Sequence, residues 1–237
     1  MSDSIDGFFL DDWLHARQAF ISKISALGGS FESLPIAQKG PNGEELSIGI
    51  GTIYLGDNKE TSSERLLVHI SGVHGVEGFA GSSAQLGILS GITPDKLKLW
   101  GHSDGAVVFI HSVNPFGMSW LRRNNAQNVD LNRNATNHRA QAVTPNAYEE
   151  IHSILTDPSV LTMFWPLRLA YLIATKGKNY VMQGLSGGQY QFADGFFYGG
   201  RDLQNELILL KDFLGRRFPE ARQIFAIDIH TGLGPYG

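Results

Sequence analysis

Short apolar runs and segments with helical periodicity alternate along this chain. Four runs rich in β-branched and other apolar residues end in turn-forming residues, and they predict strands at residues 45–56, 65–72, 105–115 and 223–232. The last three runs are apolar with little interruption, which is typical of strands buried in a parallel sheet.

Between these runs, apolar residues recur at the spacing of helices that bury one side. Together with start and stop signals from Pro and Gly, they predict helices at residues 12–29, 79–91, 144–157 and 202–219. Residues 166–178 predict a further helix and strand of the core. This order predicts a single α/β domain over residues 1–237, with a mostly parallel or mixed central sheet flanked by helices. Such sheets bind ligands at the carboxyl ends of their strands.

Composition narrows the classes of partner and site. Of the 237 residues, 42% are hydrophobic and 18% charged, and the net charge of −4 favours neither nucleic acid nor an anionic membrane surface as a partner. No apolar run reaches the roughly 18 residues of a transmembrane helix, and the acidic start has no signal-peptide pattern, so we expect a cytoplasmic protein. The chain has no cysteine, so a metal would have to be held by His and carboxylate side chains. Nothing in the sequence predicts the oligomeric state.

His74 and Glu77 follow the second predicted strand, in the sequence SGVHGVEG of residues 71–78. At i, i+3 spacing in a helical turn, the imidazole and the carboxylate can reach one cation, and the flanking glycines permit a tight turn. Because H-x-x-E also arises by chance, the pair alone is weak support. His230 stands at the carboxyl end of the last predicted strand and completes a His₂Glu set, a ligand pattern of catalytic zinc.

Asp228 lies two residues before His230, on the same side of the predicted strand. One interpretation makes it a partner that orients a ligand histidine or a metal-bound water. The other makes it a solvated or helix-capping carboxylate.

The stretch of residues 113–134, VNPFGMSWLRRNNAQNVDLNRN, is dense in side chains that bind anions and amides: Arg122, Arg123, Asn125, Asn132 and Arg133. Arginine matches carboxylates with two parallel hydrogen bonds, and an arginine near a metal can stabilise an oxyanion. A polar surface loop is the plainer interpretation, but the pairing of NP-x-G with DLNRN favours a functional role.

In this order, H-x-x-E, NP-x-G…R-x-N…VDLNRN and D-I-H-T-G resemble the zinc carboxypeptidase superfamily of M14-like metallopeptidases, and within it the DUF2817 family. The resemblance runs from about Leu66 to the end. It implies a zinc carboxypeptidase-like (phosphorylase/hydrolase-like) fold and one Zn²⁺ per chain. The residue roles that it implies are metal ligation by His74, Glu77 and His230, oxyanion stabilisation by Arg123 with Arg122 as the competing choice, and binding of a substrate carboxylate by Asn132 and Arg133.

The implied activity is hydrolysis of an amide bond next to a free carboxylate of a small peptide, by metal-activated water. The D-x-H-T ending is also similar to the succinylglutamate desuccinylase and aspartoacylase branch, so hydrolysis of N-acyl amino acids is the alternative. Superfamily members use a glutamate beyond the third ligand as general base, whereas TGLGPYG after His230 has no carboxylate. We therefore expect the chain to lack its C-terminal portion. There are two alternatives. Asp228 takes the place of the missing glutamate as general base, or the chain is an inactive paralogue that still binds metal.

GLSGG at residues 184–188 formally matches the nucleophile elbow of serine hydrolases, which needs a strand before Ser186 and a helix after it. Residues 187–200 are rich in Gly and aromatic residues. They predict either a mobile loop that lines a cleft, with Tyr190, Phe197 and Tyr198 as substrate contacts, or a packed surface loop.

Overall fold

A computed structural model describes residues 5–55, 63–93, 95–97, 105–135, 146–156 and 164–232. The chain forms two compact units, Met1–Ala126 with Asn205–Gly237, and Gln127–Gln204. The expectation of one metallohydrolase domain over residues 1–237 stays a prediction.

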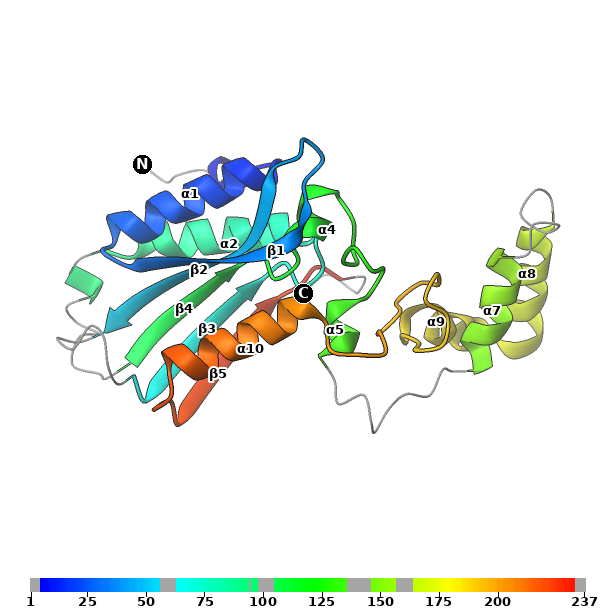
Figure 1. The fold of residues 1–237 in the computed structure, drawn as a ribbon. Helices are drawn as coiled ribbons and strands as arrows, with labels where there is room; N and C mark the ends of the chain where they lie inside the picture. Colours follow the sequence, from blue (N-terminus) through cyan, green and yellow to red (C-terminus); the bar gives the residue numbers. More distant parts are fainter. Residues whose placement is uncertain are drawn as a thin grey trace. The chain divides into compact units, whose positions relative to one another are not determined.

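The first unit is built on a mixed sheet of five strands (Figure 1). Their bounds are β1 Ser30–Lys39, β2 Glu45–Leu55, β3 Arg65–Ser71, β4 Gly105–His111 and β5 Gln223–Ile229, and their spatial order is β1-β2-β4-β3-β5. The β1–β2 and β2–β4 pairs are antiparallel, whereas β3 pairs in parallel with β4 and β5. The predicted α/β class with a mixed central sheet is therefore confirmed.

Helices cover the sheet on both sides in Figure 1, with α1 Trp13–Ala26 and α2 Gly78–Gly91 on one face and α10 Asn205–Arg217 on the other. The short helices η1 Ile5–Phe8 and α4 Pro115–Ser119 belong to the same unit. Phe20 and Ile24 of α1 pack in one cluster with Ile53, Val107 and Phe109 of the sheet, because their apolar side chains recur on one face of the helix.

The four predicted strands are confirmed, and so are the helices that correspond to α1, α2 and α10. Strand β1 was not predicted, because the segment SFESLPIAQK is largely polar and contains Pro35, a residue typical of edge strands.

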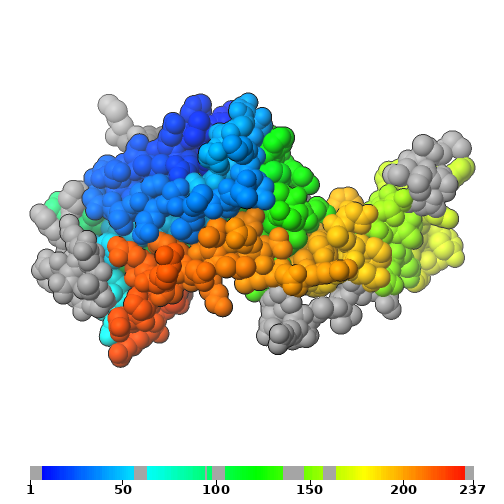
Figure 2. All heavy atoms as spheres, viewed as in Figure 1, coloured from blue at the N-terminus to red at the C-terminus, as the bar shows by residue number. Residues whose placement is uncertain are grey.

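The prediction that the 223–232 run is buried was wrong. Every residue of β5 is exposed or half-exposed, with Phe225 at 72% and Ile224 at 57%. The physical reason is that β5 stands at the edge of the described sheet and pairs there with β3 alone. Figure 2 shows this orange-red stretch at the surface.

The second unit contains α5 Leu131–Asn134, α7 Asn146–Thr156, α8 Trp165–Lys176 and α9 Lys178–Ser186. Ile151, Leu172 and Val181 form the small core shared by the last three helices. Helix α7 confirms the helix predicted at 144–157, whose Thr-Pro start lies outside the described residues.

One further prediction fails in this unit, and one formal motif match is excluded. Residues 166–178 form most of helix α8, its C-cap Gly177 and the first residue of α9 rather than a helix and strand of the core. Leu172 is the one residue of α8 that is buried. Ser186 is the last residue of α9 and its hydroxyl donates to the Met182 carbonyl at 2.7 Å, so GLSGG does not follow a strand and is no nucleophile elbow. Within the described part of the chain, no helix combines the length and apolar character needed to cross a bilayer.

Candidate metal centre

Two neighbouring parallel strands bring the predicted metal ligands together. β3 ends at Ser71, which pairs in register with Ile229, the last residue of β5. His74 therefore follows one strand end and His230 the next. Glu77 is the N-cap residue of α2, so the turn after β3 holds it beside His74.

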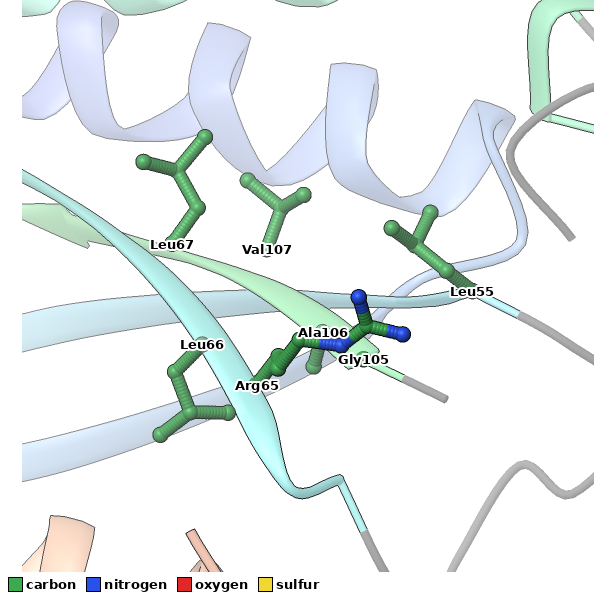
Figure 3. Close-up of a pocket in the computed structure, with 7 residues that line it drawn as sticks. All are labelled: Leu55, Arg65, Leu66, Leu67, Gly105, Ala106 and Val107. Carbon is green, nitrogen blue, oxygen red and sulfur yellow. The ribbon is translucent and has the colours of Figure 1, made fainter. Parts of the chain in front are cut away.

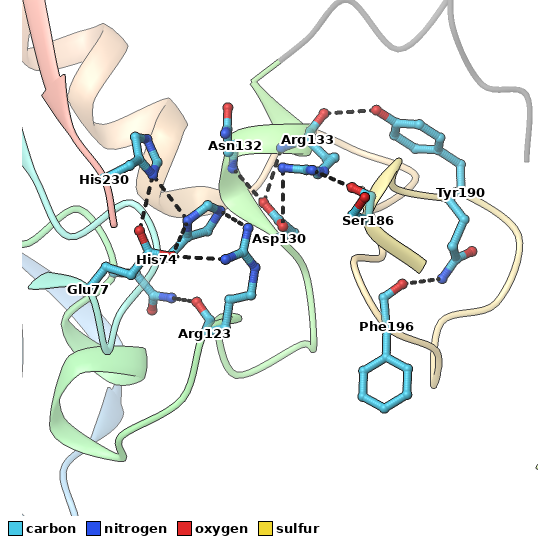
Figure 4. Close-up of polar contacts among 12 residues, drawn as sticks. His74, Glu77, Arg123, Asp130, Asn132, Arg133, Ser186, Tyr190, Phe196 and His230 are labelled. Carbon is cyan, nitrogen blue, oxygen red and sulfur yellow. Dashed lines mark hydrogen bonds and ion pairs between the residues drawn. The ribbon is translucent and has the colours of Figure 1, made fainter. Parts of the chain in front are cut away.

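The nitrogen and oxygen atoms of these three side chains converge (Figure 4). His74 Nδ1 lies 3.0 Å from Glu77 Oε1 and 3.1 Å from His230 Nδ1, and His230 Nδ1 lies 3.5 Å from Glu77 Oε2. Ligands at about 2.0–2.2 Å around a tetrahedral ion are separated by about 3.3–3.6 Å, so these distances fit a single zinc with little adjustment. The three residues form a group that could hold a metal ion, with all three donor atoms within 4.8 Å of one another.

Further hydrogen bonds hold the side chains of Glu77 and His230 in place. The backbone N–H of Thr231 donates to Glu77 Oε2 at 2.7 Å. His230 Nε2 lies 2.6 Å from Asp228 Oδ2, so the carboxylate fixes the ring with Nδ1 toward the other ligands. A carboxylate that orients a ligand histidine makes such a contact, and this role of Asp228, whose side chain is 33% exposed, stays a prediction.

The turn that carries His74 depends on a close backbone approach at Gly75. A Cβ atom there would lie 2.0 Å from the carbonyl carbon of Gly117, so only glycine fits. The approach lets the Gly75 N–H donate to the Arg123 carbonyl at 3.0 Å and the Val76 N–H to the Arg122 carbonyl at 3.0 Å. The two arginines are thereby fixed beside the ligand turn.

Sequence reasoning missed the role of Asn114, although its signal was present. Asn114 caps α4 by accepting from the Gly117 N–H at 2.8 Å, as an Asn before Pro-x-Gly predicts, and its Nδ2 donates to the Arg123 carbonyl at 3.2 Å. Its side chain is fully buried and helps to hold the Arg123 backbone.

The structure separates the two neighbouring arginines. Arg123 Nη1 donates to Glu77 Oε1 at 2.9 Å, and its Nη2 lies 2.8 Å from His74 Nε2. The exposed Arg122 stacks on Phe116 instead, at 5.9 Å from the ring centroid. Of these two arginines, Arg123 is the one whose guanidinium contacts the proposed metal ligands.

Asn125, another predicted anion-binding residue, is buried and has a different partner. Its Nδ2 donates to Glu206 Oε1 at 3.3 Å. Burial raises the pKa of the Glu206 carboxyl. The amide therefore stabilises a buried acid of α10.

Asn132 and Arg133 belong to the second unit, where Asp130 caps α5 and accepts from both of their backbone N–H groups. The side chain of Asn132 is exposed. Arg133 Nη2 donates to the Ser186 carbonyl at 2.8 Å (Figure 4). Its guanidinium lies 5.6 Å from the Phe197 ring centroid. The arginine is thus held in place while 24% of its side chain stays exposed.

The aromatic segment 187–200 is tied to residues of the VDLNRN motif within the same unit. Tyr190 donates through its hydroxyl to the Arg133 carbonyl at 3.0 Å, and the Tyr198 carbonyl accepts from the Asp130 N–H at 2.7 Å. Asn134 Nδ2 donates to the Gly199 carbonyl at 2.8 Å. These bonds favour the interpretation of a packed loop, and they use the Tyr190 hydroxyl for anchoring.

A depression of about 330 Å³ opens at the amino ends of β3 and β4 and the end of β2 (Figure 3). Its lining is apolar apart from Arg65. Because the metal group lies beyond the carboxyl ends of β3 and β5, this depression is not the site that the histidines define.

The fold of this chain is similar to that of a solved structure. The crystal structure of thrombin activatable fibrinolysis inhibitor (TAFI) is similar at a TM-score of 0.51 and 12% identity, over 91% of this chain and 46% of that chain. A "putative metallopeptidase" from Shewanella baltica OS155 matches at a TM-score of 0.39 and 20% identity, over 58% and 42% of the two chains. An aspartoacylase family protein from Mesorhizobium loti matches at a TM-score of 0.27 and 22% identity, over 45% and 30%. This chain therefore spans less than half the length of each. No curated protein sequence matches it.

The mixed sheet, its strand order and the likeness to TAFI define an α/β protein that shares its fold with that structure. Within that class, residues 9–237 match the model of the family described as "Protein of unknown function (DUF2817)". The chain belongs to the DUF2817 family, as the order of its motifs predicted.

Proposed function

We propose that this protein is a zinc-dependent hydrolase of the carboxypeptidase type, which cleaves an amide bond next to a free carboxylate. The observation that carries the proposal is the convergence of His74, Glu77 and His230 at the carboxyl ends of two parallel strands, with their donor atoms within 4.8 Å. Two histidines and one glutamate leave a fourth position for water or substrate, as in catalytic zinc sites.

A zinc ion held there would supply Lewis acidity to an amide carbonyl and to a water molecule. The residues of the chain have separate tasks around it. Asp228 and the Thr231 N–H hold His230 and Glu77 in the orientation needed for ligation. Arg123, with a guanidinium beside both His74 and Glu77, is suited to stabilise negative charge that develops on the carbonyl oxygen.

The proposed substrate is a small peptide, and Asn132 and Arg133 are proposed to bind its carboxylate, as the resemblance of VDLNRN implies. The alternative is an N-acyl amino acid. The close Asp228–His230 pair favours keeping this alternative, because it belongs to the D-x-H-T ending that resembles the deacylase branch. Both substrates have an amide bond and a free carboxylate.

The test is hydrolysis by the zinc-loaded protein of three matched substrate sets: N-acylated dipeptides, the same dipeptides with an amidated C-terminus, and N-acyl amino acids. The proposal predicts turnover that is lost with a chelator, restored by zinc and absent in His74→Ala. Arg123→Met is expected to lower kcat about 10²–10³-fold, and the matched variant of the exposed Arg122, Arg122→Met, to leave it unchanged.

The variant Arg133→Ala tests whether Arg133 binds the substrate carboxylate, independently of whether the protein hydrolyses amides. Loss of a charged hydrogen bond should raise KM for the free acids about 10–100-fold and leave the amidated substrates unaffected. An unchanged KM for the free acids would show that Arg133 does not bind the carboxylate. Zinc uptake with no turnover of any set would instead support a metal-binding protein without catalysis.

A further inference from the structure

We propose that Arg123 opposes metal binding at the His74–Glu77–His230 group, and that metal loading releases its guanidinium from His74. This inference rests on the proposed metal site and concerns the ligand residues of this chain. The observation behind it is the donor and acceptor pattern around the His74 ring.

Arg123 contacts two of the three proposed ligands at once (Figure 4). Its Nη1 donates to Glu77 Oε1 at 2.9 Å, and its Nη2 lies 2.8 Å from His74 Nε2. The side chains of His74 and Glu77 are 4% and 8% exposed, whereas that of Arg123 is 32% exposed. The guanidinium can therefore move without disturbing a buried core, and the two ligand side chains cannot.

The contact with His74 fixes the position of the ring proton. A guanidinium nitrogen can only donate, so His74 Nε2 must accept, and the proton of the neutral ring then sits on Nδ1. Nδ1 is the nitrogen that faces Glu77 Oε1 at 3.0 Å and His230 Nδ1 at 3.1 Å. The hydrogen bond to Arg123 thus places a proton on the nitrogen that faces the other ligands.

A ligand nitrogen must offer a lone pair to the metal. When His74 ligates through Nδ1, the neutral ring has its proton on Nε2, and Nε2 then meets the Arg123 Nη2 donor 2.8 Å away. Two donors at that distance repel. The Arg123–His74 hydrogen bond and ligation by His74 Nδ1 therefore exclude one another, although the ring remains neutral in both cases.

The positive charge of Arg123 also opposes metal binding. Arg123 and a divalent cation would share the Glu77 carboxylate, and their positive charges repel each other across a largely buried site. Release from His74 leaves Nη2 available to another acceptor, such as the oxygen of a bound carbonyl. Metal loading and the availability of Arg123 for substrate are then coupled events.

The test is zinc affinity, measured by competition with a chromophoric chelator at pH 7.5 on protein stripped of metal by dialysis. Arg123→Met keeps the length of the side chain and removes its charge and donors. Removal of one opposing hydrogen bond predicts a Kd for zinc that is about 3–10-fold lower than in the wild type. Arg122→Met removes an equal charge one residue away and should leave the Kd unchanged.

The opposite sign would overturn the proposal. A side chain that merely supports the ligands raises metal affinity about 10–100-fold, so weaker or unchanged binding in Arg123→Met contradicts an opposing role. If the wild type takes up no zinc, the proposed metal site is wrong. This outcome can be told apart from a measurable Kd that rises or stays unchanged in Arg123→Met, which would contradict only the opposing role of Arg123.

A second measurement needs no variant. Long-range ¹H–¹⁵N spectra of the wild-type protein report which nitrogen of His74 holds the proton. The proposal predicts the Nδ1–H form in stripped protein and the Nε2–H form after zinc is added. An Nε2–H form already in the stripped protein would contradict it.

Discussion

His111 predicts a specific dependence of stability on pH. It is the last residue of β4, is fully buried, and stacks on Phe20 of α1 with ring centroids 4.9 Å apart. Its Nε2 lies 3.0 Å from the Ser82 hydroxyl of α2. Burial, with a smaller contribution from the Arg17 charge, lowers the pKa of His111 from 6.5 to about 3.

The sign and size of the effect follow from linkage. Because the pKa is lower in the folded protein, the unfolded chain binds the extra proton below pH 6.5, and stability falls as the pH drops. Between pH 7.5 and 5.5 the unfolded His111 goes from about one tenth to about nine tenths protonated while the folded residue stays neutral, which removes about 1.4 kcal/mol of unfolding free energy. Replacement by Gln keeps a polar partner for Ser82 and abolishes the titration.

The assay is urea unfolding of the wild type and His111→Gln at both pH values, in the presence of a chelator. The other histidines are common to both proteins, so the wild type should lose about 1.4 kcal/mol more than the variant between pH 7.5 and 5.5. His15→Gln, at a side chain 72% exposed in α1, is the matched control and should behave as the wild type. Equal losses in wild type and His111→Gln would refute the reasoning.

Two further variants test the site. Asp228→Asn replaces the carboxylate that lies 2.6 Å from His230 Nε2 and should weaken zinc binding about 10–100-fold in a chelator competition, whereas an unchanged Kd would mark Asp228 as a solvated carboxylate. Gly75→Ala places a Cβ 2.0 Å from the Gly117 backbone and should cost about 1–3 kcal/mol of unfolding free energy in urea. The control is Gly87→Ala in α2, where the atom nearest to the new Cβ would be 3.8 Å away, and it should leave the unfolding free energy unchanged or raise it. Equal changes in unfolding free energy for the two variants would contradict the close approach at Gly75.

The apolar runs predicted where strands lie but not which strands are buried. Hydrophobic periodicity reports the character of a segment, whereas burial depends on its neighbours in space. The run containing Phe225 is as apolar as β4, yet it stands at the edge of the sheet and is exposed. Strand β1 was not predicted because its sequence is largely polar, although its backbone pairs with β2.

At the site, spacing and order were sufficient to propose His74, Glu77 and His230, because each follows or precedes a recognisable element. The resemblance favoured Arg123 with Arg122 as the competing choice, because the two residues are adjacent and their side chains are chemically identical. In the structure, backbone pairing with Gly75 and Val76 holds both arginines beside the ligand turn, and the guanidinium of Arg123 is the one that contacts Glu77 and His74. Such contacts join residues nearly fifty positions apart, and no local pattern predicts them.

The most direct test of the central claim is the zinc content per chain of the purified protein by elemental analysis. Wild type would be measured beside His74→Ala and His230→Ala, with His15→Ala as an exposed control. The proposed site predicts about one zinc per chain in the wild type and the control, and loss of the metal in the other two variants. Absence of zinc from the wild type after zinc has been supplied, or its retention in both ligand variants, would contradict the claim.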